Sequence, residues 1–158
     1  MPDAKGNPLE DRSSIGEMGL TFAGDPRLMG AVRGFVRRLC RVAGFEPSSC
    51  HAITLAVDEA CTNIIKHSYN NDFSGRIEMK IALLERGIGI ELIDYGEKVD
   101  PSTVEPRKLD EPRPGGLGVF FIRKIMDEVE FDVSNRSFTR LRLVKYLPRA
   151  EENNECER

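Results

Sequence analysis

An alternation of apolar and polar side chains between residues 75 and 92 constrains the fold of this chain more than any other feature. In its first half, apolar residues recur at every second position, at Ile77, Met79, Ile81 and Leu83. This two-residue period is typical of a strand with one buried face. Arg86-Gly87 predicts a tight turn, and the apolar positions resume after it at Ile88, Ile90 and Leu92. We therefore expect an antiparallel hairpin whose apolar face packs against another layer.

Two stretches before the hairpin carry the period of amphipathic helices. Asp25 suits the N-cap of the first helix, and Pro26 suits its first position. The apolar residues of this helix are Leu28, Val32, Phe35, Val36 and Leu39. Gly44 ends it, and a second helix is expected from Pro47 to about Tyr69, where residues 70–72 (Asn-Asn-Asp) end it. Its apolar stripe consists of Ile53, Ala56, Val57, Ala60 and Ile64.

The remaining pattern completes a domain of the α+β class. Further strands are expected at residues 18–23, 129–133 and 138–147, and a third helix at residues 119–126. Strands joined by hairpins predict a two-layer α/β sandwich, with a mainly antiparallel sheet and the helices on one face. We expect this domain to span residues 18–148, between a disordered leader at residues 1–17 and an acidic tail at residues 149–158.

Composition and charge exclude several classes of protein. Hydrophobic residues make up 40% of the 158-residue chain, which is typical of one globular domain. The net charge of −3 argues against direct nucleic-acid binding. Three arginines, Arg33, Arg37 and Arg41, form either a solvated helix face or a docking stripe for an acidic partner. No apolar run approaches the ~20 residues that cross a bilayer, and residues 1–17 lack a hydrophobic signal segment, so we expect a cytoplasmic protein without membrane contact.

The cysteines do not predict a metal site. The four of them, Cys40, Cys50, Cys61 and Cys156, have no C-x-x-C spacing and no paired histidines. In a cytoplasmic protein we expect reduced thiols, with Cys40 and Cys61 acting as small apolar residues on helices.

Glu59 and Asn63 are the first candidates for chemistry. They lie four residues apart on the second predicted helix and so share one face, with Lys66 and His67 one turn further. An amide oxygen suits Mg²⁺, which prefers oxygen ligands and takes others from phosphates. Glu59 could then act as a base towards a hydroxyl or water beside the phosphates. Taken alone, such a pair is more typical of a wet helix surface.

Two glycine-containing motifs follow. Asp94-Tyr95-Gly96 ends a predicted strand, where it suits either an ordinary turn or a carboxylate that accepts a hydrogen bond from the amine of adenine. After a proline-rich stretch, Gly115, Gly116, Leu117 and Gly118 precede the third helix. Glycines at a helix start free backbone N–H groups for an anion, although a plain hinge has the same pattern. The spacing matches neither a P-loop nor a Rossmann motif.

In this order, the three elements resemble the GHKL ATP-binding domain, which has the Bergerat fold. The matching stretches are LAVDEACTN at 55–63, KHSY at 66–69, DYG at 94–96 with DP at 100–101, and GGLGVFFIRKIMD at 115–127. Within that superfamily the chain is most similar to the bacterial anti-sigma factor serine/threonine kinases of the RsbW and SpoIIAB type. The resemblance spans about residues 18–147.

The resemblance implies roles for particular residues. Glu59 matches the catalytic base, and Asn63 matches the magnesium ligand. Asp94 matches the residue that reads adenine, with Thr139 in support. The other residues grouped with ATP binding are Lys66, Gly96, Gly115, Gly116, Leu117 and Gly118, of which the last four match the phosphate-facing hinge of a lid.

The resemblance also implies cofactors and partners. It implies ATP and Mg²⁺ as cofactors. It also implies two partners, a sigma factor that is sequestered and a STAS-type anti-sigma factor antagonist that is phosphorylated. The family members are similar in being cytoplasmic homodimers that regulate transcription by partner switching.

The family usually carries a second glycine where this chain has Lys98. That difference leaves a non-catalytic ATP-binding module as the alternative. The lid cation near the γ-phosphate could be Arg107, Lys108 or Arg113.

A sensor histidine kinase is a weaker interpretation. Nothing before residue 18 is expected to supply a dimerising helix pair with a phospho-accepting histidine. His51 and His67 both fall inside the second predicted helix, where a structural role is expected.

Overall fold

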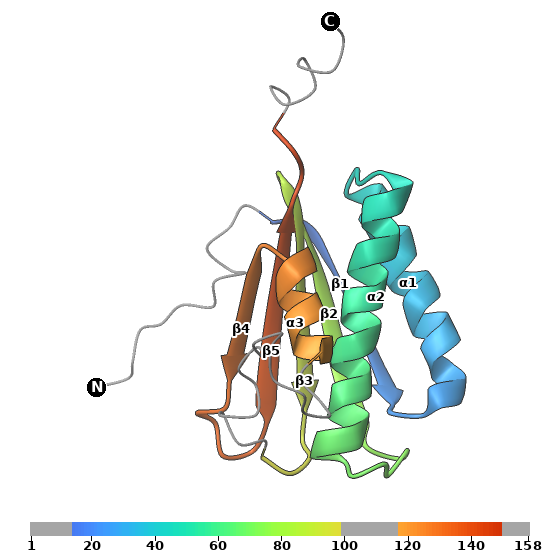
Figure 1. Ribbon diagram of the computed structural model, residues 1–158, viewed down its shortest axis with the longest axis vertical. Coiled ribbons are helices and arrows are strands. Elements are labelled where there is room, and N and C mark those ends of the chain that lie inside the picture. Colours follow the sequence, from blue (N-terminus) through green and yellow to red (C-terminus); the bar gives the residue numbers. More distant parts are fainter. Residues whose placement is uncertain (1–13, 99–116, 150–158) are drawn as a thin grey trace, which may run out of the picture.

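The computed structural model describes residues 14–98 and 117–149 and arranges them in two layers (Figure 1). One layer is a five-stranded sheet in the order β1-β2-β3-β5-β4, in which every neighbouring pair is antiparallel. The strands are β1 (Ser14–Ala23), β2 (Arg76–Leu84), β3 (Gly87–Asp94), β4 (Glu128–Asp132) and β5 (Thr139–Tyr146). The predicted α+β class and antiparallel sheet are confirmed.

The second layer consists of helices that cover one face of the sheet (Figure 1). They are α1 (Met29–Val42), α2 (Pro47–Asn63) and α3 (Leu117–Ile125). A 3-10 turn, η1 (Pro26–Leu28), precedes α1, and a π-helical segment, η2 (Ile64–Ser68), continues α2. The helix predicted from Pro47 is therefore present, but its last turn is wider than an α-helical turn.

The core lies between the two layers, on the faces that the sequence predicts. The sheet contributes fully buried residues from β2, β3 and β5, namely Ile77, Met79, Ile81, Ile88, Ile90, Leu92 and Leu143. All members of the stripe predicted for the second helix are buried as well. Each fully buried isoleucine of this set contributes about 1.5–3 kcal/mol relative to an exposed one. Leu83 is only half-buried, at the hairpin end of the sheet.

Two predicted boundaries are wrong. β1 begins at Ser14 rather than at residue 18, so the end of the predicted leader is a strand. Its pairing with β2 extends from Ser14 opposite Leu84 to Ala23 opposite Arg76. Backbone hydrogen bonds to the edge of β2 explain this extension, because they need no apolar side chains. The hairpin turn is residues 85–86, one residue earlier than predicted, since Gly87 already pairs with Leu84.

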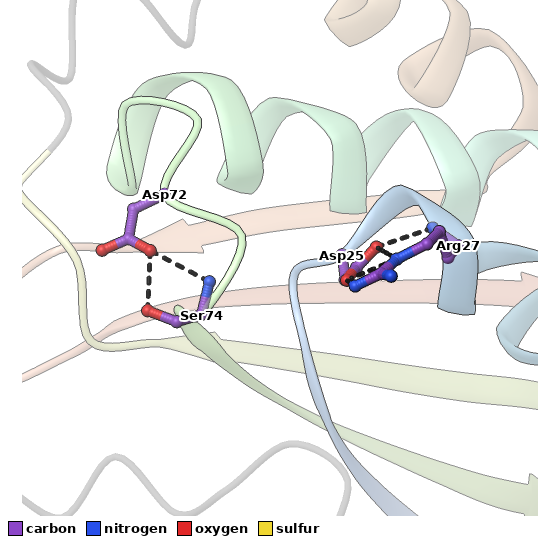
Figure 2. Close-up of polar contacts among 4 residues, drawn as sticks. All are labelled: Asp25, Arg27, Asp72 and Ser74. Atoms are coloured by element: carbon purple, nitrogen blue, oxygen red, sulfur yellow. Dashed lines mark hydrogen bonds and ion pairs between the residues drawn. The ribbon is translucent and has the colours of Figure 1, made fainter.

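Short polar turns fix the ends of the helices (Figure 2). The carboxylate of Asp25 accepts a hydrogen bond from the backbone N–H of Arg27 at 2.9 Å, which confirms the predicted N-cap. After η2 the chain turns at Asn70 and Asn71, whose φ values are 50° and 62°. Asp72 then accepts hydrogen bonds from the backbone and hydroxyl of Ser74. The helix thus ends where the sequence predicts, which brings the following residues back to the start of β2.

Candidate functional site

Glu59 and Asn63 face the first turn of α3. A β-carbon built on Gly118 would lie 2.7 Å from Glu59 Oε2, 3.5 Å from Asn63 Nδ2 and 3.7 Å from Asn63 Oδ1. Glu59 and Asn63 are both half-buried on α2. Glu59 has no hydrogen bond or ion pair to any residue in the described ranges. These three residues, which we call the acid–amide cluster, leave a carboxylate and an amide free beside a backbone without a side chain.

A pocket of about 340 Å³ lies beside Glu59. It lies between α2 and α3 and is lined by Leu55, Asp58, Glu59, Leu117, Gly118 and Phe121. Glu59, Leu117 and Gly118 were predicted as site residues, whereas the other three were not. Leu55 had a detectable signal, because it lies one helical turn before Glu59 and is an exposed leucine on an otherwise patterned helix.

Asp94 belongs to a second group at the other end of the site. It is 3% exposed at the end of β3, and the backbone N–H of Gly96 donates to its Oδ1 at 3.2 Å. Burial raises the pKa of Asp94 above its usual value, while hydrogen bonds from Gly96 and the Ser68 side chain act in the opposite direction, as does the charge of Lys98. The carboxylate is therefore held in place but remains costly to ionise.

Thr139 and Gly96 complete this group. Thr139 is buried and lies directly opposite Asp94 in the β3–β5 pairing. A β-carbon on Gly96 would lie 2.2 Å from the backbone oxygen of Ser68, so glycine is required for the close approach of this loop to η2. We call Ser68, Asp94, Gly96 and Thr139 the buried-aspartate cluster. Ser68, which the sequence analysis missed, joins it to α2 through η2.

Lys98, which departs from the family pattern, has a structural role. Its Nζ donates to the backbone oxygens of Val133, at 3.0 Å, and Phe138, at 3.4 Å. These bonds tie the segment after Gly96 to the loop between β4 and β5. The lysine therefore stabilises the flank of the buried-aspartate cluster.

The other predicted residues either lie outside these clusters or fall outside the described part of the chain. Lys66 is exposed in η2 and has no hydrogen bond or ion pair to another described residue. Gly115 and Gly116 lie outside the described residues, as do the lid cations considered in the sequence analysis, Arg107, Lys108 and Arg113.

The three cysteines in the described part of the chain are structural, whereas Cys156 lies outside it. Cys40, Cys50 and Cys61 are buried and unpaired, and burial raises the pKa of Cys40 and of Cys61 to about 12. Within residues 14–98 and 117–149, no group of three or more His, Cys, Asp or Glu side chains could hold a metal ion.

None of the helices in residues 14–98 and 117–149 combines the length and apolar character that crossing a bilayer requires.

Known proteins share both the sequence pattern and the fold. Residues 22–145 match the family described as the histidine kinase-like ATPase domain. The serine-protein kinase RsbW of Oceanobacillus iheyensis is 31% identical over 134 residues, which cover 80% of this chain and 84% of that protein. The RsbW of Staphylococcus aureus is 34% identical over 113 residues, which cover 66% of this chain and 70% of that protein.

Two solved structures have the same fold. The SiaB–SiaC complex from Pseudomonas aeruginosa superimposes with a TM-score of 0.61 at 18% identity, over 80% of this chain and 88% of the other. The RsbU and RsbW domains of Rv1364c from Mycobacterium tuberculosis superimpose with a TM-score of 0.60 at 19% identity, over 84% of this chain and 32% of the other. The sequence matches show that this chain belongs to the histidine kinase-like ATPase family, and within it to the RsbW serine-protein kinases.

Proposed function

We propose that this chain transfers the γ-phosphoryl group of ATP to a serine or threonine of an anti-sigma factor antagonist of the STAS type, and that it sequesters a sigma factor. The observation that carries the proposal is the placement of Glu59 and Asn63 against Gly118, with Asp94 buried beyond η2. A nucleotide that spans these two clusters would have its base at one end and its phosphates at the other.

The buried-aspartate cluster suits the adenine base. The carboxylate of Asp94 is an acceptor for the exocyclic amine, and Gly96 keeps the loop that follows it close to η2. The backbone N–H of Gly96 and the Ser68 side chain already hold this carboxylate, so little ordering is needed when the nucleotide binds. Thr139 lies opposite Asp94 in the β3–β5 pairing, and we propose that it supports the same group.

The acid–amide cluster suits Mg²⁺ and the phosphates. Asn63 offers a neutral amide oxygen, and the missing side chain at Gly118 leaves a space that a β-carbon would fill. This donor set fits a hard cation that takes most of its ligands from water and phosphate. When bound, Mg²⁺ neutralises the charge of the phosphate oxygens. Leu117 and Gly118, with Gly115 and Gly116 before them, would present backbone N–H groups to the same phosphates.

Glu59 has the free carboxylate that proton transfer requires. It accepts the proton of the acceptor hydroxyl as the hydroxyl oxygen bonds to the γ-phosphorus. The bond between that phosphorus and the bridging oxygen breaks, and ADP leaves with the electron pair. Because Glu59 has no hydrogen bond or ion pair to a described residue, its lone pairs are available for this step.

Phosphoryl transfer to purified antagonists tests the proposal. The chain is mixed with Mg²⁺, radiolabelled ATP and each STAS-domain protein encoded by the same genome. We expect one or a few antagonists to be labelled on serine or threonine, and we expect Glu59→Gln to abolish labelling while ATP binding persists. If no antagonist is labelled by the unaltered chain, the kinase assignment fails.

The sigma factor, the homodimer and the cytoplasmic location are further parts of the proposal. They rest on the resemblance to anti-sigma factor kinases. Light scattering measures the oligomeric state, and calorimetry with sigma factors of the same genome measures sequestration. A monomer at micromolar concentration, or no sigma factor that binds, would remove the corresponding part.

A non-catalytic binding module is the second candidate. Lys98 favours it, because its two hydrogen bonds fix a segment in which the family usually has a glycine. Tight binding of ATP and a partner without phosphoryl transfer would select this alternative.

A further inference from the structure

The pocket beside Glu59 has apolar walls and an acidic end. Leu55 on α2 and Leu117 on α3 are 37% and 59% exposed, and Phe121 is half-buried between the same helices. Exposed large apolar residues that converge on one hollow are characteristic of binding sites rather than of ordinary surface. The pocket shares Glu59 and Gly118 with the acid–amide cluster, but it extends to Leu55 and Phe121, which belong to neither cluster proposed to hold the nucleotide.

The order of residues along α2 gives the pocket a direction. Leu55, Glu59 and Asn63 follow one another at intervals of one helical turn, so they lie in a row on one side of the helix. α3 lies beside α2 and runs in the opposite direction (Figure 1), with Gly118 beside Glu59 and Asn63. The row therefore proceeds from the phosphate end, through the proposed base, to an apolar hollow about one turn away.

The charges around the pocket restrict what it accepts. Asp58 pairs with Arg33 of α1 through Nη1 and Oδ1 at 3.0 Å, so its charge is already compensated. Glu59 is the lining carboxylate without such a partner among the described residues. An acidic side chain entering the pocket would be repelled by Glu59, whereas an apolar side chain would bury surface against the leucines and Phe121.

We propose that this pocket seats an apolar side chain of the phosphoryl acceptor, immediately next to the serine or threonine whose hydroxyl meets Glu59. The proposal rests on the proposed function. It assigns a specificity role to Leu55 and Phe121, which belong to neither cluster proposed to hold the nucleotide, and it predicts that acceptors with an acidic residue at this position are rejected.

Leu55→Ser is the first test. It removes an apolar wall at an exposed position, so the fold should persist. With the antagonist that the unaltered chain labels, we expect the KM for the antagonist to rise about tenfold, as for the loss of a small apolar contact, with the KM for ATP and kcat unchanged. Leu55→Met should restore the KM for the antagonist. Val42→Ser is the matched control, because Val42 is an exposed apolar residue on α1 at 56% exposure and outside the pocket.

Changing the acceptor completes a double-mutant cycle. Apolar residues that flank the phosphorylated serine are replaced by serine one at a time. One of these replacements should raise the KM for the antagonist with the unaltered kinase. With the Leu55→Ser kinase it should raise that KM little further, because both changes remove the same contact. A cycle in which every pair of effects is additive, or a Leu55→Ser kinase with an unchanged KM, would overturn the pocket assignment while leaving the kinase reaction intact.

A binding readout separates failure of the pocket from failure of the proposed reaction. p-Benzoylphenylalanine is introduced at position 55 or, as the control, at position 42, and each protein is irradiated with the purified STAS-domain proteins. We expect crosslinks from position 55 alone, to the residue next to the acceptor serine. Such a crosslink without phosphoryl transfer would retain the pocket and reject the kinase reaction, whereas equal crosslinking from both positions would reject the pocket.

Discussion

The two ends of the candidate site are constructed in opposite ways. Asp94 is 3% exposed and accepts hydrogen bonds from the Gly96 backbone and the Ser68 side chain. Glu59 and Asn63 are half-buried, and a β-carbon built on Gly118 would lie within 4 Å of both side chains. The end proposed to recognise the base is thus fixed in advance, while the end proposed to perform the chemistry remains open.

This difference suits the role proposed for each end. A recognition group gains affinity when its partners already hold it, because less ordering is needed on binding. A general base must exchange partners during the reaction, so prior hydrogen bonds would compete with the acceptor hydroxyl. Glycine serves both ends but for different reasons: Gly96 contacts rigid backbone, whereas Gly118 contacts the far end of a flexible side chain.

Gly96→Ala should break the rigid end and have the largest effect. The new methyl group would lie 2.2 Å from the backbone oxygen of Ser68, so the loop or η2 must shift. We expect the free energy of unfolding to fall by about 1–3 kcal/mol, and ATP affinity to fall with it. Denaturant unfolding and calorimetry measure both quantities. Gly34→Ala is the control, since a β-carbon there meets nothing within 4 Å and should stabilise α1. Unchanged stability in Gly96→Ala would contradict the close approach.

Gly118→Ala should separate activity from stability at the open end. Its methyl group would lie 2.7 Å from Glu59 Oε2, which can move away without disturbing the backbone. We expect kcat to fall between about tenfold and about hundredfold, because a base displaced by about 1 Å loses its alignment. The free energy of unfolding should stay constant or rise, since alanine favours helix more than glycine. A loss of stability as large as that of Gly96→Ala would show that the two ends are equally rigid.

The sequence predicts the elements of this site better than it predicts how they are joined. Glu59 and Asn63 share a helix face because their spacing dictates it, and Asp94 ends a strand because the hairpin pattern ends there. Both inferences need only local periodicity. The α+β architecture follows from the same patterns, and all five strands lie within a few residues of the predicted positions.

The residues that the sequence analysis missed depend on long-range contacts. Ser68 meets Asp94 because the last turn of the second helix is π-helical, and the segment IIKHS has no pattern that distinguishes it from α-helix. Lys98 meets the β4–β5 loop 35 residues further along the chain. Leu55 and Phe121 form one pocket only when α3 packs on α2. The position of Leu55 one turn before Glu59 is a local signal, but none of the contacts themselves has a signal within a single element.

The ionisation of Asp94 offers a pH test of the buried end. Burial raises its pKa, so in the free protein the cost of holding the carboxylate ionised disappears as the pH falls through that raised pKa. Binding of adenine requires the ionised carboxylate of Asp94 as acceptor. Nucleotide affinity should therefore decline as the pH falls through the raised pKa of Asp94. Calorimetry with a non-hydrolysable ATP analogue, from neutral pH to about pH 4, measures the decline. Asp94→Asn should lack the part of the decline that comes from Asp94. Subtracting its affinity profile from that of the unaltered chain removes the contribution of the nucleotide's own ionisation. Identical profiles would place the adenine elsewhere.

Lys98→Met should have the smallest effect and sharpens the comparison further. It removes the ammonium that bonds to the backbone oxygens of Val133 and Phe138 but keeps most of the stem. Because Lys98 is exposed, we expect the free energy of unfolding to fall by about 1 kcal/mol or less.

The more informative consequence of Lys98→Met concerns Asp94. The lysine charge is one of the influences that lower the pKa of Asp94, so its removal should raise that pKa and shift the loss of nucleotide affinity to higher pH. Lys80→Met is the control, because Lys80 is an exposed lysine that pairs with Glu17 in the sheet at 3.4 Å. If Lys98→Met destabilises the chain but leaves the pH profile of nucleotide binding unchanged, the lysine serves only as a loop anchor. A shift of the profile would instead show that a lysine in place of the family's usual glycine adjusts the charge state of Asp94, the group proposed to read the base.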